Sequence, residues 1–157
     1  WYSITWYNSI YNYDMRLIEY KKLHLTYTIT ENIEAGIELF GFEVKSLRSK
    51  LGSLDGTRII IRGGEGFLVG GYIPAYQPAN TPKSYDPYRT RRLLLKKEEL
   101  YKLSDTETAK TLTLAPHSLY LKKGLVKCDI ALCKKKTTND KRELIKKDIS
   151  RRELREH

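Results

Sequence analysis

The sequence has few of the residues that build disulfides, metal sites and redox centres. It contains two cysteines, Cys128 and Cys133, no C-x-x-C motif, and three scattered histidines at positions 24, 117 and 157. An odd separation within one strand places the two thiols on opposite faces, so we expect neither a mutual disulfide nor a metal site. This cysteine usage favours a reducing compartment such as the cytosol.

Long apolar runs and catalytic motifs are also missing. No stretch approaches the roughly 20 consecutive apolar residues of a membrane span, and no G-x-S-x-G, H-E-x-x-H or Cys/His pairing occurs. Residues 63–66 are glycine-rich but lack the spacing of phosphate-binding loops, which indicates a hairpin turn. Nothing marks Asp86, Glu98 or Glu99 as an acid/base pair. We therefore expect no enzyme, no cofactor and no small-molecule substrate.

Acidic residues are outnumbered. The 157 residues include 29 Lys and Arg against 19 Asp and Glu, a net charge of +10, and the pI is near 9.5. The length suits one domain. The charge favours a polyanionic partner, either nucleic acid or an anionic membrane surface, and composition does not separate the two. The many tyrosines suit base stacking and equally suit ordinary strands.

Short alternating segments between Gly and Pro residues predict a β-rich α+β fold. We expect five or six strands and two or three short helices, arranged as a small, partly open antiparallel barrel of the OB type. The pattern alone also fits other small α+β folds. A long loop over residues 74–92 holds four of the five prolines, and such loops are usually functional or disordered. The predicted strands cover residues 23–37, 57–62, 67–73, 111–114, 118–121 and 125–132, and the predicted helices cover residues 42–48 and 96–102.

The two ends of the chain differ from this body. Residues 1–14 contain both tryptophans and no Lys or Arg, which favours Met15 as the true start over an organelle-targeting segment or an expression leftover. We assign residues 1–22 to a disordered or wrongly included extension, residues 23–133 to the barrel and residues 134–157 to a basic tail. The tail has ten Lys/Arg against five Asp/Glu and no coherent apolar stripe, so we expect disorder alone and a helix on RNA. A merely solvating tail is the alternative.

A short helix over residues 42–48, which follows the turn glycine Gly41, is predicted to organise the chain. Val44, Leu47 and Leu51 share one face at helical spacing and can pack inward. Lys45 and Arg48 share another face, one turn apart, and can hold phosphates. The competing interpretation is a solvated basic surface helix.

Five segments, in order, resemble the small protein B family, the tmRNA-binding (SsrA-binding) proteins of bacteria. One of them is G-F-E-V-K-S-L-R at residues 41–48, which is similar to the family's G-x-E-V-K-S-L-R. The resemblance covers most of the chain, from about Tyr27 to the C-terminus. The other segments are E-A-G-I at 34–37, F-L-V-G at 67–70, D-P-Y-R-T-R-R-L-L-L at 86–95 and D-K-R at 140–142.

The resemblance implies an oligonucleotide-binding-like barrel and a non-enzymatic role in trans-translation. Such proteins bind the tRNA-like domain of tmRNA and carry it to stalled ribosomes, where the tail enters the empty mRNA channel next to the decoding centre of the small subunit. The compartment would be the bacterial cytoplasm, or an organelle if organelle-encoded. The implied RNA-binding residues are Glu43, Lys45, Arg48, Arg89, Arg91, Arg92, Lys127, Lys134 and Lys136. The implied ribosome-contacting residues of the tail are Asp140, Lys141, Arg142, Ile145 and Lys146.

The chain departs from the family pattern at several places. Lys135 replaces a usual glycine, Asn139 replaces a residue that often stacks, and the pair after Lys146 is Lys147-Asp148 instead of E-R. RNA binding is therefore a firmer expectation than action in the decoding centre. Two alternatives stay open: a general OB-type RNA or single-stranded DNA binder, and a peripheral membrane or protein-interaction module.

Overall fold

A single antiparallel sheet of seven strands forms the body of the protein. The computed structural model describes residues 15–156, and the strand order is β1-β6-β7-β2-β5-β4-β3. The α+β class is thus confirmed, with seven strands instead of five or six. The strands are β1 (Met15–Glu19), β2 (Tyr27–Ile37), β3 (Arg58–Arg62), β4 (Glu65–Val69), β5 (Arg91–Leu94), β6 (Thr113–Lys122) and β7 (Leu125–Lys135).

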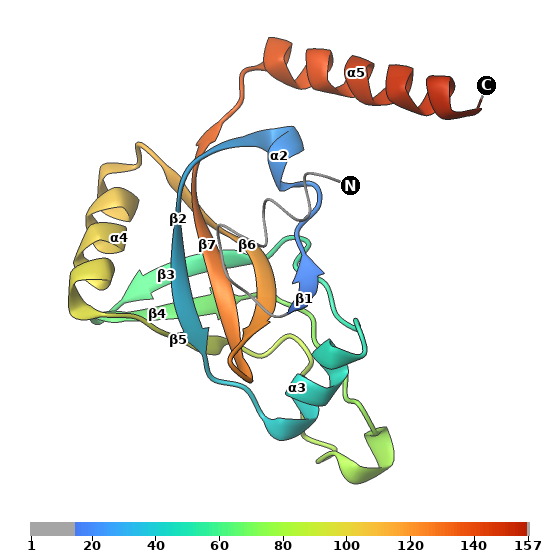
Figure 1. Cartoon of the computed structure of the whole chain (residues 1–157). Helices are drawn as coiled ribbons and strands as arrows, with labels where there is room; N and C mark the ends of the chain where they lie inside the picture. Colours follow the sequence, from blue (N-terminus) through green and yellow to red (C-terminus); the bar gives the residue numbers. More distant parts are fainter. Residues whose placement is uncertain (1–14, 157) are drawn as a thin grey trace.

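The sheet bends strongly but its hydrogen bonds do not close it into a barrel. β3 and β4 turn across β6 and β7 (Figure 1), and β3 comes close to β6. Within residues 15–156, however, strand pairing leaves β1 and β3 as free edges. The described residues form four helices, more than predicted, and one short 3-10 helix. These are α2 (Leu23–Thr26), α3 (Gly41–Arg48), α4 (Lys97–Ala109), α5 (Thr138–Glu156) and η1 (Pro78–Asn80).

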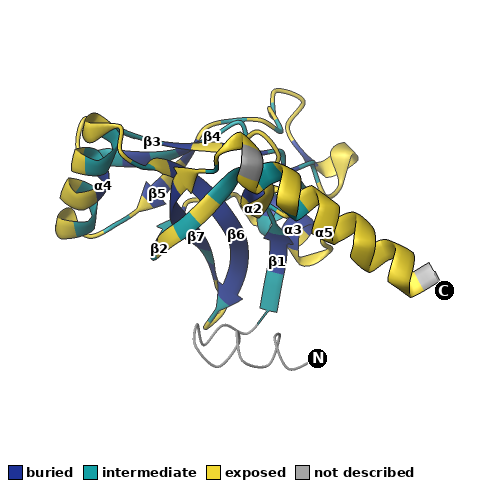
Figure 2. Cartoon of the chain, turned by 90° about the horizontal axis from the view of Figure 1, so that it is seen from above, coloured by how far each residue is buried: buried dark blue, intermediate teal, exposed yellow. Residues whose placement is uncertain are grey.

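The core fills the space inside the bent sheet. Leu47 of α3, Leu103 of α4 and Leu119 of β6 are fully buried together with residues of the other strands. α4 packs on β3 and β6, and α3 packs on β1. Figure 2 shows the buried residues concentrated in the strands, whereas α5 is exposed along most of its length. Cys128 belongs to this core and Cys133 to a separate buried cluster, which confirms that the two thiols lie on opposite faces.

Several segments differ from the predicted strands. β4 covers residues 65–69 instead of 67–73, and β5 forms where the predicted loop ends and no strand was expected. Residues 23–26 form one helical turn instead of the start of a strand, because Leu23 turns into the smaller buried cluster while Leu25 stays exposed. β6 does not stop at Pro116 but runs through it, with a register shift between Pro116 and Ser118. A bulge accommodates a residue that has no backbone N–H to donate.

The predicted N-terminal extension overlaps the sheet. Met15–Glu19 forms β1 and pairs with β6 from Met15 opposite Leu121 to Glu19 opposite Ser118. Leu17 and Ile18 are both buried. The sheet therefore begins before the predicted boundary at residue 22. The interpretation of residues 1–14 lies outside the described residues.

The long strands β2 and β7 give the molecule two functional ends. In their ladder Gly36 lies opposite Lys127 near one end, and Thr28 lies opposite Lys134 near the other. Seven residues of strand separate these pairs by roughly 23 Å. The first end leads into α3 and the second carries α2 and α5 (Figure 1), so we refer to them as the α3 end and the α5 end.

Candidate nucleic-acid interface

The N-terminus of helix α3 is capped by a side chain of the helix, that of Glu43. The carboxylate of Glu43 accepts a hydrogen bond from the backbone N–H of Phe40 (2.7 Å), as in one half of a capping box. Leu47 is fully buried and Val44 partly buried, as predicted. Leu51 was wrongly placed on this face: the helix ends at Arg48, and Leu51 is 43% exposed.

Glu43 is the centre of a buried ionic cluster, defined as Glu43, Tyr85, Arg89 and Arg91. The side chains of Glu43 and Arg91 are 0% exposed. Nε of Arg91 donates to Oε2 of Glu43 (2.8 Å), and Arg89 forms an ion pair with the same carboxylate. The Tyr85 hydroxyl lies 3.0 Å from Oε2. The cluster thus joins α3 to the segment that enters β5, more than forty residues later in the chain.

Arg91 also ties down the backbone around it. Nη1 donates to the carbonyl oxygens of Gly71 (2.8 Å) and Arg89 (3.1 Å), and Nη2 donates to that of Pro87 (3.0 Å). Two charges out of water are costly unless paired and hydrogen-bonded, and here the donors and acceptors satisfy each other. The predicted proline-rich loop is therefore held in one conformation near its C-terminal end.

The titration behaviour of the cluster follows from these contacts. Burial alone would raise the pKa of Glu43, but the hydrogen bonds from Arg89 and Phe40 and the charge of Arg91 outweigh it and hold the pKa below its ordinary value. Burial, followed by the negative charge of Glu43, raises the pKa of Tyr85 to about 12. At neutral pH the cluster therefore contains a carboxylate, two guanidinium groups and a neutral phenol.

Cations and aromatic rings surround the cluster on the surface. The guanidinium of Arg89 lies 4.2 Å from the ring centroid of Phe40, a cation–π contact. Arg92 is half exposed and pairs with Glu65 at 2.9 Å and Glu38 at 3.4 Å. On α3, Lys45 and Arg48 are exposed and make no ion pair among the residues described. The exposed ion pairs of Arg92 contribute little to stability, so Arg92 can exchange them for contacts with phosphates.

The structure separates the sequence-predicted RNA residues into two groups. Lys45, Arg48, Arg89, Arg92 and Lys127 lie at the α3 end. Lys134 and Lys136 lie at the α5 end, and Lys136 is tied to α2 because its Nζ donates to the carbonyl oxygen of His24 (2.7 Å). Glu43 and Arg91 also lie at the α3 end, but both side chains are buried and do not reach solvent.

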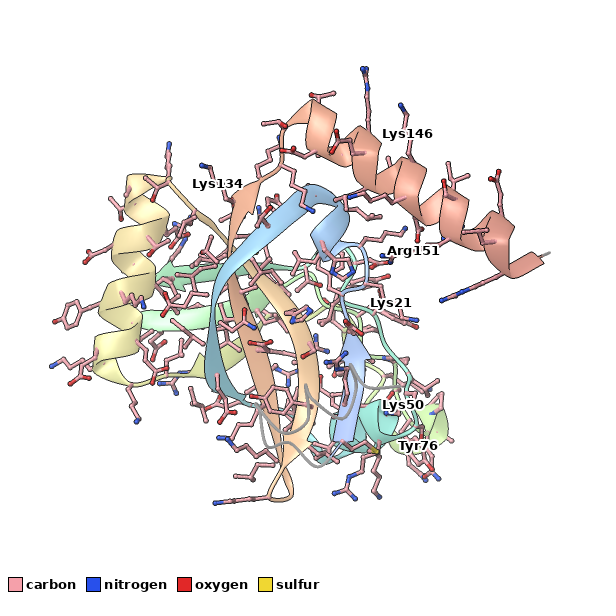
Figure 3. The ribbon with its side chains drawn as sticks, turned by 45° about the horizontal axis from the view of Figure 1, so that its top comes forward. Lys21, Lys50, Tyr76, Lys134, Lys146 and Arg151 are labelled. Carbon is pink, nitrogen blue, oxygen red and sulfur yellow. The ribbon has the colours of Figure 1, made fainter. Side chains whose placement is uncertain are left out.

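The tail is a continuous helix over Thr138–Glu156. Asp140 accepts hydrogen bonds from the backbone and hydroxyl of Thr137, which lower the pKa of its carboxyl. Along the helix, Asp148 and Arg152 form an ion pair across one turn, at 3.2 Å. Nineteen residues extend roughly 28 Å, and beyond its contact with α2 the helix projects away from the body (Figures 1 and 3). Lys146 and Arg151 project from it as labelled in Figure 3; Arg142 and Ile145 are exposed, and Lys141 is partly buried.

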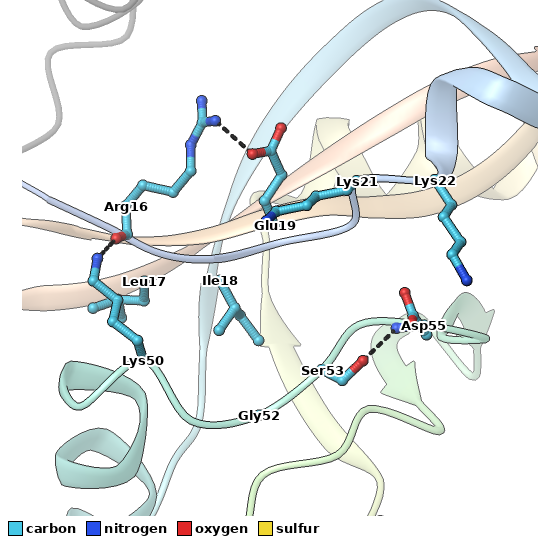
Figure 4. Close-up of a pocket in the computed structure, with 10 residues that line it drawn as sticks. All are labelled: Arg16, Leu17, Ile18, Glu19, Lys21, Lys22, Lys50, Gly52, Ser53 and Asp55. Carbon is cyan, nitrogen blue, oxygen red and sulfur yellow. Dashed lines mark hydrogen bonds and ion pairs between the residues drawn. The ribbon is translucent and has the colours of Figure 1, made fainter. Parts of the chain in front are cut away.

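A groove of about 600 Å³ lies between β1 and the loop after α3. Its walls include Arg16, Lys21, Lys22, Lys50 and Ser53 (Figure 4). Lys50 donates to the carbonyl oxygen of Arg16, so one cation is already used to hold the loop against β1. None of these residues was among the predicted site residues, although the adjacent lysines at 21 and 22 are a visible signal of charge.

The sequence predicts neither a metal site nor a membrane span. Residues 15–156 contain no cluster of His, Cys, Asp and Glu suited to a metal ion. In the same part of the chain, no helix has both the length and the apolar character needed to cross a bilayer. Sequence reasoning missed Phe40 and Tyr85 as partners of the arginines, because each stands just before a recognised segment, at residues 41–48 and 86–95, and not within it.

Comparison with known proteins identifies close relatives. Residues 17–157 match the family model described as SmpB protein. The chain is 44% identical over 138 residues to the SsrA-binding protein of Mesoplasma florum, covering 87% of this chain and 93% of that protein. It is 43% identical to that of Burkholderia vietnamiensis (85% and 90% covered) and 45% identical to that of Persephonella marina (85% and 88%). A chain from a solved structure described as "tmRNA-SmpB: a journey to the center of the bacterial ribosome" superposes with a TM-score of 0.65 at 35% identity, covering 82% of this chain and 93% of that chain.

Proposed function

The chain belongs to the SmpB family of SsrA-binding proteins, and from this premise we propose that it binds tmRNA and delivers it to stalled ribosomes in trans-translation. The protein acts by binding and breaks no covalent bond. The observation that carries the proposal is the cationic and aromatic surface at the α3 end, built on a buried ionic cluster in a chain whose relatives are SsrA-binding proteins.

We propose that the α3 end contacts the tRNA-like domain. Folded RNA is recognised chiefly through its shape, its phosphates and its exposed bases. Exposed or partly exposed cations on α3, around β5 and on β7 supply phosphate contacts, whereas Glu43 and Arg91 support that surface from within instead of touching RNA. The proposed RNA contacts at this end are Lys45, Arg48, Arg89, Arg92 and Lys127.

The α5 end is proposed to contact the small ribosomal subunit. α5 projects from the body, is exposed over most of its length and carries seven Lys and Arg. These features suit entry into the vacant mRNA channel beside the decoding centre. The residues proposed for this role are Lys134, Lys136, Asp140, Lys141, Arg142, Ile145 and Lys146. Whether the free tail is disordered and folds only on the ribosome stays a prediction.

In this proposal the bent sheet sets the distance between the two RNA-binding ends. We propose that it serves as an OB-type scaffold, with its barrel-like curvature holding two RNA-binding ends about one strand length apart. The two ends of one sheet can then contact two different RNA molecules. The proposed partners place this work in the bacterial cytoplasm.

The test is a gel-shift titration of the full chain with the tRNA-like domain of tmRNA against an ordinary tRNA, at two salt concentrations. We expect tighter binding to the tRNA-like domain, with affinity falling as salt rises because phosphate contacts release counterions. The Lys45→Ala/Arg48→Ala variant should lose part of that affinity. A matched control with the same charge change is Lys97→Ala/Lys102→Ala on α4.

Equal binding of both RNAs, unaffected by the α3 variant, would contradict the proposal. That outcome would leave a general basic RNA-binding protein as the better interpretation. Binding to anionic vesicles in the absence of RNA preference would instead favour a peripheral membrane protein.

A further inference from the structure

We propose that Tyr88 is a stacking platform for an unpaired base of the bound RNA. The inference rests on the proposed function and adds a contact of a different chemical kind, because the predicted site consists almost entirely of charged residues. Base–aromatic stacking tolerates any base and adds affinity that salt does not screen.

Tyr88 is unusually exposed for an aromatic residue. Its relative exposure is 59%, and its ring centroid lies 5.1 Å from that of Tyr72 with the planes tilted by 41°. One face of the ring is therefore supported by a second aromatic ring while the residue as a whole stays open to solvent. Single exposed tyrosines are common on protein surfaces. The contact with Tyr72, however, holds the Tyr88 ring in one orientation.

The backbone that carries Tyr88 is fixed on both sides. The buried Arg91 donates to the carbonyl oxygens of Pro87 (3.0 Å) and Arg89 (3.1 Å), the two residues that flank Tyr88. The Tyr88 N–H donates to the carboxylate of Asp86 (2.9 Å), and the N–H of Ile73 donates to Pro87 (3.0 Å). A rigid mount lowers the entropy lost on binding, so the exposed ring is preorganised for a partner.

The surroundings of Tyr88 identify the partner as RNA. Arg89 is adjacent in the chain, and Tyr72 behind the ring exchanges backbone hydrogen bonds with Ser53 in the loop that follows α3. Tyr88 thus lies between the loop after α3 and the arginines of β5, within the cationic surface already described. An aromatic ring surrounded by cations favours a nucleobase attached to phosphates over an apolar peptide.

Phe40 and Tyr101, two other exposed aromatic residues, are less suited to this role. Phe40 is 50% exposed, but its ring already contacts both the Arg89 guanidinium, at 4.2 Å, and the Phe42 ring, with centroids 5.4 Å apart. Tyr101 is 64% exposed and lies on α4, which packs on β3 and β6 away from the Glu43 cluster. Tyr101 therefore provides a control of the same side chain and similar exposure.

The experiment measures the affinity of the full chain and its variants for the tRNA-like domain of tmRNA. Tyr88→Ala should weaken binding on the order of ten- to a hundredfold, without changing the slope of log K against log salt. Tyr88→Phe should stay within about twofold of the wild type, because stacking needs the ring and not the hydroxyl. Tyr101→Ala should bind like the wild type. Thermal unfolding of each variant checks that it is folded.

A second measurement covers the case in which Tyr88→Ala does not fold. In Tyr88→Trp, an indole stacked on a base should lose fluorescence on RNA addition beyond the change seen in the wild type, which carries the same Trp1 and Trp6 background. Equal affinity of Tyr88→Ala and Tyr101→Ala, or no additional quenching in Tyr88→Trp, would overturn the stacking role alone. A wild type without preference for the tRNA-like domain would overturn the proposed function, and a wild type that binds neither RNA would overturn both.

Discussion

Nε of Arg91 lies 2.8 Å from the carboxylate of Glu43, and neither side chain reaches solvent. The pair joins a helix to a strand that begins more than forty residues later. It also fixes the loop carbonyls that position the exposed residues of the RNA surface. Stability and RNA binding should therefore depend on the same buried contact, and they can be measured separately.

The first prediction concerns stability. Glu43→Gln removes the negative charge but keeps the shape, which leaves the Arg91 guanidinium buried without its counter-charge. Breaking a buried pair from one side costs about 3 to 5 kcal/mol of unfolding free energy. Urea unfolding followed by circular dichroism measures that difference.

The matched control is Glu38→Gln. Glu38 also pairs with an arginine, Arg92, but both side chains are about half exposed. An exposed pair contributes about 0 to 1 kcal/mol, so this variant should unfold nearly like the wild type. Similar losses for both variants, or a Glu43→Gln loss below about 1 kcal/mol, would contradict the role given to the buried pair.

The second prediction is the pH dependence of the same contact. The folded-state pKa of Glu43 lies below its ordinary value of 4.5, so the unfolded chain takes up the proton at a higher pH than the folded chain. The stabilisation is therefore complete above pH 4.5 and is lost as the pH falls through the folded pKa. The stability difference between wild type and Glu43→Gln should be constant from pH 7 to 5 and shrink at lower pH.

Because the stability of wild type is compared with that of Glu43→Gln at each pH, the contributions of the other acidic groups cancel. Glu34 and Asp140 also have lowered pKa values, and both are present in the two proteins. Unfolding curves measured at intervals from pH 7 to 3 provide the data. A difference that stays constant down to pH 3 would show that protonation of Glu43 does not control this stability.

The local parts of the fold could be predicted from the sequence. The hairpin turn predicted at residues 63–66 is formed by Gly63 and Gly64, which adopt positive φ values of +59° and +73°, and β4 begins at Glu65. Gly124 similarly has a φ of +75° in the turn between β6 and β7. Alternation located most of β2 and β7. These features depend on neighbouring residues, so a pattern along the chain contains the information.

The remaining features depend on distant residues. The alternation over residues 23–26 fits a strand, but the burial of Leu23 against β6 and β7 residues makes one helical turn instead. Pro116 marks a strand end by local rules, whereas the bulge after it is possible only with the partner strand present. The motif around Glu43 indicated an RNA-facing carboxylate, and its burial became evident only with Arg91 in place.

The third prediction concerns the phosphate contacts of α3. Each phosphate contact to folded RNA contributes roughly 0.7 to 0.9 to the slope of log K against log salt. Because Lys45 and Arg48 are exposed and one turn apart, the double alanine variant should reduce the magnitude of the slope for the tRNA-like domain by about 1.4 to 1.8. Filter binding at five salt concentrations measures it.

The α4 variant Lys97→Ala/Lys102→Ala has the same loss of net charge. It should leave the slope within about 0.5 of the wild-type value, because α4 is not part of the surface around α3. If both double variants lower the slope equally, RNA contact follows net charge rather than position, and the assignment of the contact to α3 is wrong.

The last prediction separates the two ends of the molecule. Ile149 lies in the middle of α5, at a position 50% exposed and far from the sheet. Ile149→Pro should break the helix, since proline costs about 3 kcal/mol in a helix interior, and lower the helical signal in circular dichroism. The unfolding midpoint of the body should not change, because α5 contacts the body mainly through α2. Binding to the tRNA-like domain should also be unchanged, while the tmRNA complex should bind stalled ribosomes more weakly.

Ile149→Ala removes the same side chain but keeps the helix, so it should bind ribosomes like the wild type. If Ile149→Pro instead impairs binding to the tRNA-like domain alone, the tail contacts tmRNA directly and the division of the protein into two RNA-binding ends is wrong.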